Sequence, residues 1–180
     1  VNFEGLRAAS RDSFTAFLTD LSREVHNMGK TLYVCVSPVL SSGPYYDGYD
    51  YRAISGLADQ VILMAYDYDA RDLSGFEGTE YYKNIAPAPI DQVFMSLEAI
   101  TSTVQNPGKI ALGFSCKNIA WQIDENERLV SGNPLYPSNE TLYKRLDQAD
   151  TIRGWSDSYQ TSYAIYTTES GERYFTWYDD

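Results

Sequence analysis

Hydrophobic residues are spaced in two ways along the chain, and the two spacings predict alternating strands and helices. Continuous apolar runs at residues 31–37, 61–68 and 109–116 are typical of strands that are buried on both faces of a sheet. Apolar residues that recur every three or four positions at residues 12–27 and 90–104 predict amphipathic helices, and a shorter helix is expected at 51–57. Because strands and helices alternate, we predict an α/β fold with a parallel sheet and right-handed connections.

Polar and aromatic side chains stand where the predicted strands end. Glu4 follows a short apolar stub, Tyr66 and Asp67 close the run at 61–68, and Trp177 lies in a last strand at 173–178. Side chains in these positions meet at the carboxyl edge of a β/α barrel, where the active sites of such barrels lie. Plainer interpretations stay open: Glu4 could be a solvated carboxylate and Trp177 a core residue. Tyr66 could close the barrel end, and Asp67 could cap a loop.

The pattern changes after residue 116 and predicts an insertion. Residues 117–171 hold scattered polar residues, a possible helix at 140–149 and a short alternating strand at 162–167, and Gly171 is expected to form a turn. We therefore expect barrel strands and helices in residues 1–116, an α+β insertion in 117–171 and the last barrel strand in 172–180. A complete barrel needs eight strands and typically ~250 residues, so the chain is expected to hold about five strands.

Composition and charge narrow the classes of partner. The net charge of −11 argues against nucleic acid and anionic membranes, and no apolar run approaches the roughly 20 residues that span a bilayer. The 16 tyrosines suggest a ligand that stacks on rings. Cys35 and Cys116 are expected to be buried thiols, and the single histidine, His26, makes a multi-His metal site or a His-based triad very improbable. The chain opens without Met or a signal peptide, so we expect a piece of something longer.

Three motifs, in order, carry a resemblance to a known family. They are V-N-F-E-G at residues 1–5, M-A-Y-D at 64–67 and Y-F-T-W-Y-D-D at 174–180. The sequence resembles glycoside hydrolase family 18, the chitinase-like barrels, and especially their bacterial spore-cortex and cell-wall lytic branch. Glu4 then falls on the catalytic acid of the fourth strand. Met64, Tyr66 and Asp67 fall on the sixth-strand motif that contacts the substrate, and Trp177 falls on the tryptophan that forms the floor of a sugar subsite.

The resemblance implies a fold and a reaction. The fold is a (β/α)8 TIM barrel, of which this chain covers about the fourth to eighth strands, the first half being supplied by missing residues of the same protein. The reaction is substrate-assisted retaining hydrolysis of β-linked N-acetylhexosamine polymers, peptidoglycan or chitin-like, with no cofactor or metal. The resemblance also implies an extracellular or cell-wall location, with neither nucleic acid nor membrane insertion involved.

One position departs from the family pattern. Asn2 stands where the family has a carboxylate two residues before the acid, on the same face of the strand. An amide can accept a hydrogen bond, but it cannot balance a developing positive charge as a carboxylate does. A catalytically weak or inactive sugar-binding barrel is therefore the alternative function, and a purely structural wall-associated domain is a third. Trp121 could line the sugar groove from the insertion or pack inside it.

Overall fold

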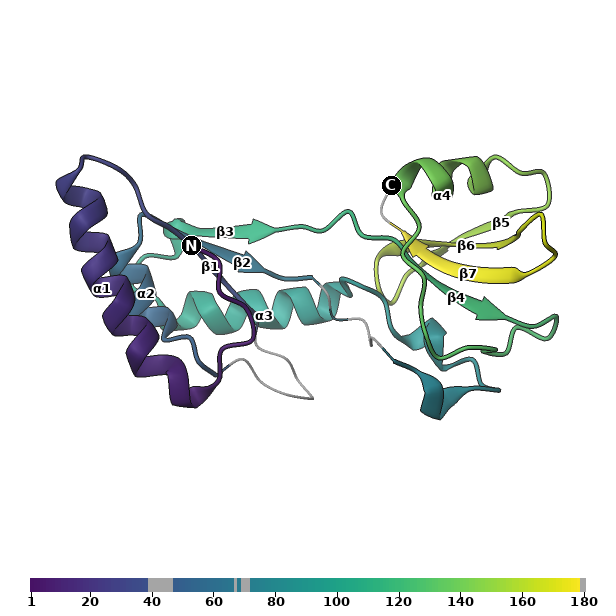
Figure 1. Cartoon of the computed structure of the whole chain (residues 1–180), viewed down its shortest axis with the longest axis horizontal. Coiled ribbons are helices and arrows are strands. Elements are labelled where there is room, and N and C mark those ends of the chain that lie inside the picture. Colours follow the sequence, from purple (N-terminus) through teal and green to yellow (C-terminus); the bar gives the residue numbers. More distant parts are fainter. Residues whose placement is uncertain (39–46, 67, 69–71, 179–180) are drawn as a thin grey trace. The chain divides into compact units, whose positions relative to one another are not determined.

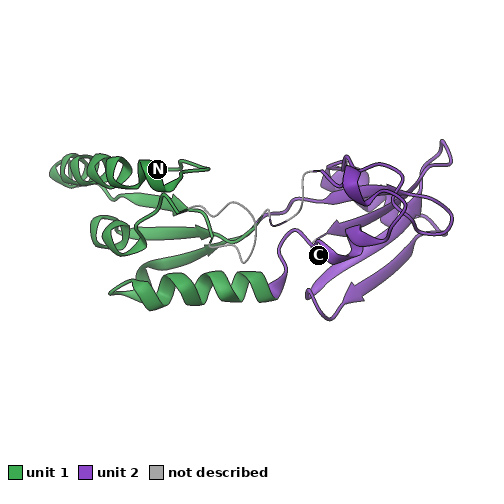
Figure 2. Cartoon of the chain, turned by 90° about the horizontal axis from the view of Figure 1, so that it is seen from below, with its two compact units in different colours: residues 1–66, 91–114 green, residues 67–90, 115–180 purple. Residues whose placement is uncertain are grey.

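The computed structural model describes residues 1–38, 47–66, 68 and 72–178, and the chain divides into two compact units (Figure 2). Unit 1 comprises residues 1–66 and 91–114, and unit 2 comprises residues 67–90 and 115–180. This division differs from the expected boundaries at residues 116 and 171. Residues 67–90 and the last strand both belong to the second unit, in whose core Leu73, Tyr82 and Ala86 pack with Phe175 and Trp177.

Unit 1 is built on a parallel sheet, as predicted. Its strands are β1 (Tyr33–Val36), β2 (Gln60–Met64) and β3 (Ile110–Gly113), in the order β1-β2-β3 (Figure 1). Asn2 forms a parallel bridge with Cys35, and the Cys35 N–H donates to the Val1 carbonyl at 2.8 Å. The stub at the start of the chain therefore continues the parallel arrangement beside β1.

Three α-helices accompany this sheet, close to their predicted limits: α1 (Arg11–Asn27), α2 (Tyr51–Leu57) and α3 (Ile90–Thr103). Short 3₁₀ turns, η1 (Ala8–Ser10) and η4 (Pro107–Lys109), precede α1 and β3. Helix α1 buries Phe14 and Leu18, and the Asp50 side chain caps α2 by accepting the Ala53 N–H at 3.0 Å. None of the helices in the described part of the chain is both long and apolar enough to cross a bilayer.

The third predicted strand is shorter than its apolar run. Strand β3 ends at Gly113, and the next residue, Phe114, is 79% exposed. Cys116 is also exposed and Cys35 is only half-buried, so the expectation that both thiols are buried is wrong. Both cysteines are free, as the apolar runs around them suggested. On α3, Val93 and Ile100 are buried, whereas Phe94 of the same predicted apolar face is 65% exposed.

The described residues of unit 2 form an antiparallel sheet and one α-helix. Its strands are β4 (Ile119–Ile123), β5 (Ile152–Ser156), β6 (Thr161–Thr167) and β7 (Arg173–Tyr178), in the order β4-β7-β6-β5. Helix α4 (Asn139–Leu146) packs Leu142 and Leu146 against Ala164 and Tyr178. The helix and β6 match the predicted elements, while β4 and β5 were not predicted. Residues of η2 (Ser74–Phe76), η3 (Tyr81–Asn84) and their surroundings complete the core.

Strand β7 lies in this antiparallel sheet, where we expected a strand of the parallel barrel. It pairs with β4 on one side and β6 on the other. The physical reason is the short connection from β6: Thr168 N–H donates to the Glu172 carbonyl at 2.8 Å, and Gly171 takes a φ of +85°. Two strands joined by so few residues form an antiparallel hairpin, since a parallel pair needs a long crossover.

Asp59 ties the start of β2 to the ends of two neighbouring elements, and this predicts a pH dependence of stability. His26 Nε2 lies 2.9 Å from Asp59 Oδ2, and the Leu32 N–H donates to the same oxygen at 2.7 Å. These two hydrogen bonds, that of His26 first, lower the pKa of Asp59 below its usual value. The stabilisation is therefore complete above the ordinary aspartate pKa and is lost as the pH falls through the lowered one.

We expect Asp59→Asn to lower the free energy of unfolding at neutral pH, with the difference from wild type shrinking as the pH falls below the ordinary aspartate pKa and through the lowered one. Urea unfolding at several pH values measures this. Asp150→Asn, which changes an exposed carboxylate, serves as the control and should leave the pH profile unchanged. A difference that stays constant down to the lowest pH would contradict the assignment.

Candidate active site

The candidate site is one face of the unit 1 sheet at the carboxyl edge of its strands. Asn2 pairs with Cys35, Cys35 with Ile62, and Ile62 with Ala111. Residues paired in this way across parallel strands lie at one level and on one face, and the residue two positions later lies on that same face. Glu4, Ser37, Met64 and Gly113 therefore share a face and a level at the end of the sheet. Tyr66 lies on this face one pleat further along.

The residues on the opposite face of these strands are buried, which shows on which face of the sheet the candidate site lies. Val34, Val36, Val61 and Leu63 alternate with the residues above and are fully buried. Cys35, Ile62 and Ala111 on the candidate face are only partly covered. The fold thus turns its branched aliphatic residues toward the core, whereas Glu4 on the candidate face is exposed beside the buried Ser37 and Met64.

Asn2 and Glu4 are in direct contact. Asn2 Nδ2 donates a hydrogen bond to Glu4 Oε1 at 3.1 Å, and both side chains are exposed. Their separation of two residues places them on one face of the extended stub, as the sequence predicted. The amide N–H₂ of Asn2 is thereby used to hold the Glu4 carboxyl group.

The backbone between Asn2 and Glu4 is held from the other side. The Phe3 ring packs edge-on against Phe14 and Phe17 of α1, with ring centroids 5.6 Å and 5.9 Å apart. The Tyr49 hydroxyl donates to the Phe3 carbonyl and lies 3.3 Å from Ser37 Oγ. Tyr49 is buried, and we identify it and Ser37 as supports of the Glu4 segment, a role that no sequence pattern pointed to.

The structure describes Met64 and Tyr66 of the motif that resembles the sixth strand of the family. Met64 is the last residue of β2 and is 6% exposed. A Cβ built on Gly113 would lie 3.3 Å from Tyr66 Cε1, so the Tyr66 ring lies close above β3 where a glycine leaves room. Asp67 lies outside the described residues. The structure thus brings Asn2, Glu4, Met64 and Tyr66 to one edge of one sheet.

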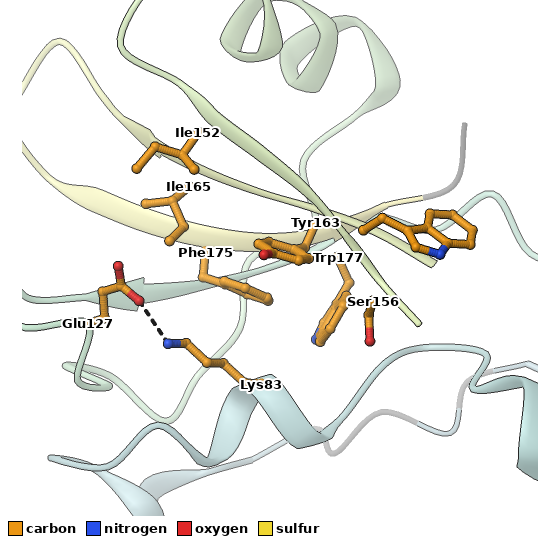
Figure 3. Close-up of a pocket in the computed structure, with 9 residues that line it drawn as sticks. Lys83, Glu127, Ile152, Ser156, Tyr163, Ile165, Phe175 and Trp177 are labelled. Carbon is orange, nitrogen blue, oxygen red and sulfur yellow. Dashed lines mark hydrogen bonds and ion pairs between the residues drawn. The ribbon is translucent and has the colours of Figure 1, made fainter. Parts of the chain in front are cut away.

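Trp177 and Trp121 lie in the hydrophobic core of unit 2, and their expected role in sugar binding stays a prediction. They are 2% and 0% exposed, and Trp177 Nε1 donates to the Tyr82 carbonyl at 3.1 Å. Figure 3 shows the Trp177 ring beside those of Phe175 and Tyr163 on the sheet, and the centroids of both rings lie 4.9 Å and 5.8 Å from that of Trp177. The rings of Phe175 and Tyr163 meet that of Trp177 edge to face, and all three also line a cavity of unit 2.

The cavity beside Trp177, about 380 Å³, is bounded by polar groups that are already paired. Lys83 donates to Glu127 at 2.8 Å, as the dashed line in Figure 3 shows, and to Glu80 at 2.7 Å. Burial alone would lower the pKa of Lys83, but these two hydrogen bonds outweigh burial and raise it. Tyr82 donates its hydroxyl to the Glu127 carbonyl at 2.9 Å, and burial raises the pKa of Tyr82 to about 12. The paired polar groups around this cavity therefore contribute to the stability of unit 2.

A family profile and several proteins of similar sequence match nearly the whole chain. The profile of Glycosyl hydrolases family 18 matches residues 2–180. YdhD of Bacillus subtilis (strain 168), named as a sporulation-specific glycosylase, is 26% identical over 183 residues, covering 100% of this chain and 40% of that protein. A cortical fragment-lytic enzyme of the same organism is 25% identical and is covered over 39% of its length. The chain thus spans about 40% of the length of these relatives.

Solved structures share the arrangement. The crystal structure of YdhD matches with a TM-score of 0.78 at 25% identity, over 99% of this chain and 56% of that chain. A chitinase from Chromobacterium violaceum ATCC 12472 matches in fold, with a TM-score of 0.72 at 20% identity, over 96% of this chain and 50% of that chain. The match over residues 2–180, joined to a parallel sheet that carries a carboxyl group and a tyrosine at its carboxyl edge, shows that this chain belongs to the glycosyl hydrolases of family 18.

Proposed function

We propose that this chain is part of a glycosidase that hydrolyses β-linked N-acetylhexosamine polymers, peptidoglycan or chitin-like, with Glu4 as the general acid. The observation that carries the proposal is the position of Glu4: exposed, held by Asn2, and level with Met64 at the carboxyl edge of the sheet in a family 18 chain. The names of the relatives, a cortical fragment-lytic enzyme and a chitinase, support this class of substrate.

The proposed reaction uses one carboxyl group of this chain. Protonated Glu4 gives its proton to the oxygen that leaves, while the acetamido oxygen of the substrate attacks the anomeric carbon and the glycosidic bond breaks. The Glu4 carboxylate then takes a proton from the water that opens the resulting oxazolinium ion, so that the anomeric configuration is retained. Glu4 therefore ends the cycle protonated, as it began.

Asn2 and the sixth-strand residues have proposed roles in placing the substrate. The Asn2 oxygen accepts the N–H of the acetamide while its N–H₂ holds Glu4. Tyr66 and Asp67 orient the acetamido group from the neighbouring strand end, and Met64 packs beneath it. The sugar contacts expected of Trp177 and Trp121 stay predictions, since both side chains are buried within unit 2.

The fold and location follow the same proposal. The parallel sheet of unit 1 forms part of an eight-stranded barrel whose other strands come from residues outside this chain, since open edges of a parallel sheet leave backbone groups unpaired. The substrate is an extracellular or cell-wall polysaccharide. Release of reducing ends from peptidoglycan and from N-acetylglucosamine oligosaccharides by the full-length protein tests the proposal, and binding without turnover on either substrate would refute it.

A sugar-binding protein with little turnover is the second candidate, and Asn2 is the observation that favours it. Asn2 is a neutral hydrogen-bond partner of Glu4. A carboxylate at the position of Asn2 would stabilise the positive charge that develops on the oxazolinium ion, and an amide does not. Retained binding of N-acetylglucosamine oligosaccharides together with negligible hydrolysis would support this alternative.

Asn2→Asp separates the two candidates. We expect kcat to rise by about tenfold or more, because a carboxylate then faces the developing positive charge. We also expect the alkaline limb of the pH–rate profile to move to higher pH, because two carboxyl groups in contact do not both ionise readily. Hydrolysis of an N-acetylglucosamine oligosaccharide from pH 4 to 9 measures both effects. Asn126→Asp, which adds the same charge in unit 2, is the control. A protein without activity that stays without activity after Asn2→Asp would show that Asn2 is not the main defect.

A further inference from the structure

A second cavity of unit 2, about 390 Å³, lies between α4, the β6–β7 hairpin and residues 135–137. Tyr166 of β6 and Tyr174 of β7 form one wall, and Arg145 of α4 contributes to another. All of these residues belong to one compact unit, so the cavity is defined within that unit. Glu4 belongs to the other unit.

The two tyrosines present hydroxyl groups without partners. Their rings are stacked, with centroids 5.8 Å apart and an interplanar angle of 22°, and the two residues are 6% and 8% exposed. Neither hydroxyl has a hydrogen-bond partner within the described chain. Burial first, and then the neighbouring Tyr174, raises the pKa of Tyr166 to about 12, so this hydroxyl stays a proton donor at neutral pH. Both residues line the cavity, so the two hydroxyls are placed to donate to a ligand inside it.

Arg145 is the third group without a partner. The structure gives its guanidinium group no hydrogen bond or ion pair among residues 1–38, 47–66, 68 and 72–178. Other cations in or near α4 are paired: Lys144 lies 2.7 Å from Glu140, and Arg153 lies 3.4 Å from Asp147. A half-buried arginine beside two tyrosine hydroxyls can offer a bidentate fork of N–H donors to a planar anion.

The remaining charges around the cavity are compatible with an anion. Lys117 Nζ lies 4.5 Å from the ring centroid of Tyr136, which lines the cavity, and so adds a second positive charge at its rim. Glu172 also lines the cavity, but its carboxylate accepts the Ser170 hydroxyl at 2.9 Å and forms no ion pair with Arg145. The guanidinium N–H groups of Arg145 can therefore donate to a ligand. A positively charged cavity of this kind is uncommon in a chain with a net charge of −11.

We infer that this cavity binds a carboxylate group of the substrate polymer, held by Arg145 and the hydroxyls of Tyr166 and Tyr174. The inference deepens the proposed function and rests on it for the identity of the polymer. Peptidoglycan carries carboxylates on its peptide stems, whereas chitin is neutral. The cavity therefore favours peptidoglycan as the substrate class and acts as an accessory site that holds an acidic part of the strand.

The test uses N-acetylmuramyl-L-alanyl-D-isoglutamine as a carboxylate-bearing probe and the N-acetylglucosamine dimer as a neutral one. Isothermal titration calorimetry is expected to show that Arg145→Gln weakens binding of the acidic probe by about tenfold or more. Tyr166→Phe, which keeps the ring and removes only the hydroxyl, should weaken it several-fold. Binding of the acidic probe should also decrease with added salt, since screening weakens ion pairing.

Lys144→Gln is the matched control, because it removes a positive charge from the adjacent position of the same helix, where the side chain is 73% exposed. It should change the affinity by less than about twofold. The neutral dimer should bind wild type and Arg145→Gln alike. Equal affinity of the acidic probe for wild type and Arg145→Gln would overturn the inference. Hydrolysis of N-acetylglucosamine oligosaccharides is measured separately, so failure of the Glu4 proposal and failure of this one are distinguishable.

Discussion

Glu4→Gln is expected to reduce kcat for hydrolysis by about 10²- to 10⁴-fold while leaving the affinity for the substrate nearly unchanged. The glutamine keeps the size of the side chain and an oxygen that can accept the hydrogen bond from Asn2 Nδ2. What it loses is a proton to give to the leaving oxygen, and this loss affects the transition state more than the bound substrate.

Two measurements on the same variant make this expectation specific. Release of reducing ends gives kcat, and calorimetric titration with an N-acetylglucosamine oligosaccharide gives the affinity. Glu98→Gln, which changes an exposed carboxylate on α3 of the same unit, should retain full activity. Undiminished hydrolysis by Glu4→Gln would remove Glu4 from the mechanism, and hydrolysis absent from the wild type as well would favour the sugar-binding function.

Gly132→Ala is expected to destabilise unit 2 by about 3 kcal/mol or more, which is large for one methyl group. A Cβ at this position would lie 2.0 Å from the Ser74 backbone nitrogen and 2.5 Å from the Leu73 carbonyl carbon. These are backbone atoms, so no side-chain rotation relieves the overlap. Two hydrogen bonds join the same segments: the Leu73 N–H donates to the Gly132 carbonyl at 2.8 Å, and the Gly132 N–H donates to the Glu77 carboxylate at 2.9 Å.

Gly75→Ala is the matched control, because a Cβ at Gly75 meets no atom within 4 Å. We expect it to change the free energy of unfolding by less than about 0.5 kcal/mol. Urea unfolding followed by near-ultraviolet circular dichroism reports the packing of the aromatic residues of unit 2. A Gly132→Ala protein as stable as wild type would contradict the close approach of these two segments.

The sequence pattern predicts the helices and the parallel sheet well because their signals are local. The limits of α2 match the prediction, and the order of strand and helix leads to the parallel pairing of β1, β2 and β3. The contact between Asn2 and Glu4 also follows from spacing alone, since residues two apart in an extended strand lie on one face. These predictions needed no knowledge of distant contacts.

The predictions that fail depend on which distant segment a strand meets. We expected residues 172–180 to form a strand of the barrel, yet the hairpin turn at Gly171 commits β7 to an antiparallel sheet, where Trp177 Nε1 donates to the Tyr82 carbonyl. The short turn was present in the sequence and could have predicted this pairing. The support of Phe3 by Tyr49 joins residues 46 positions apart, and no periodicity reveals such a contact.

The division of the chain has a consequence for recombination and protein engineering. Unit 2 is assembled from two separate stretches, residues 67–90 and 115–180, and Leu73, Tyr82 and Ala86 of the first stretch cover Trp121 and Phe175 of the second. A single crossover between relatives that exchanges only the second stretch therefore mixes two halves of one core. Chimeric proteins should retain their fold only when both stretches come from the same parent. Recombination between relatives should therefore keep the two stretches together, although they are far apart in the gene.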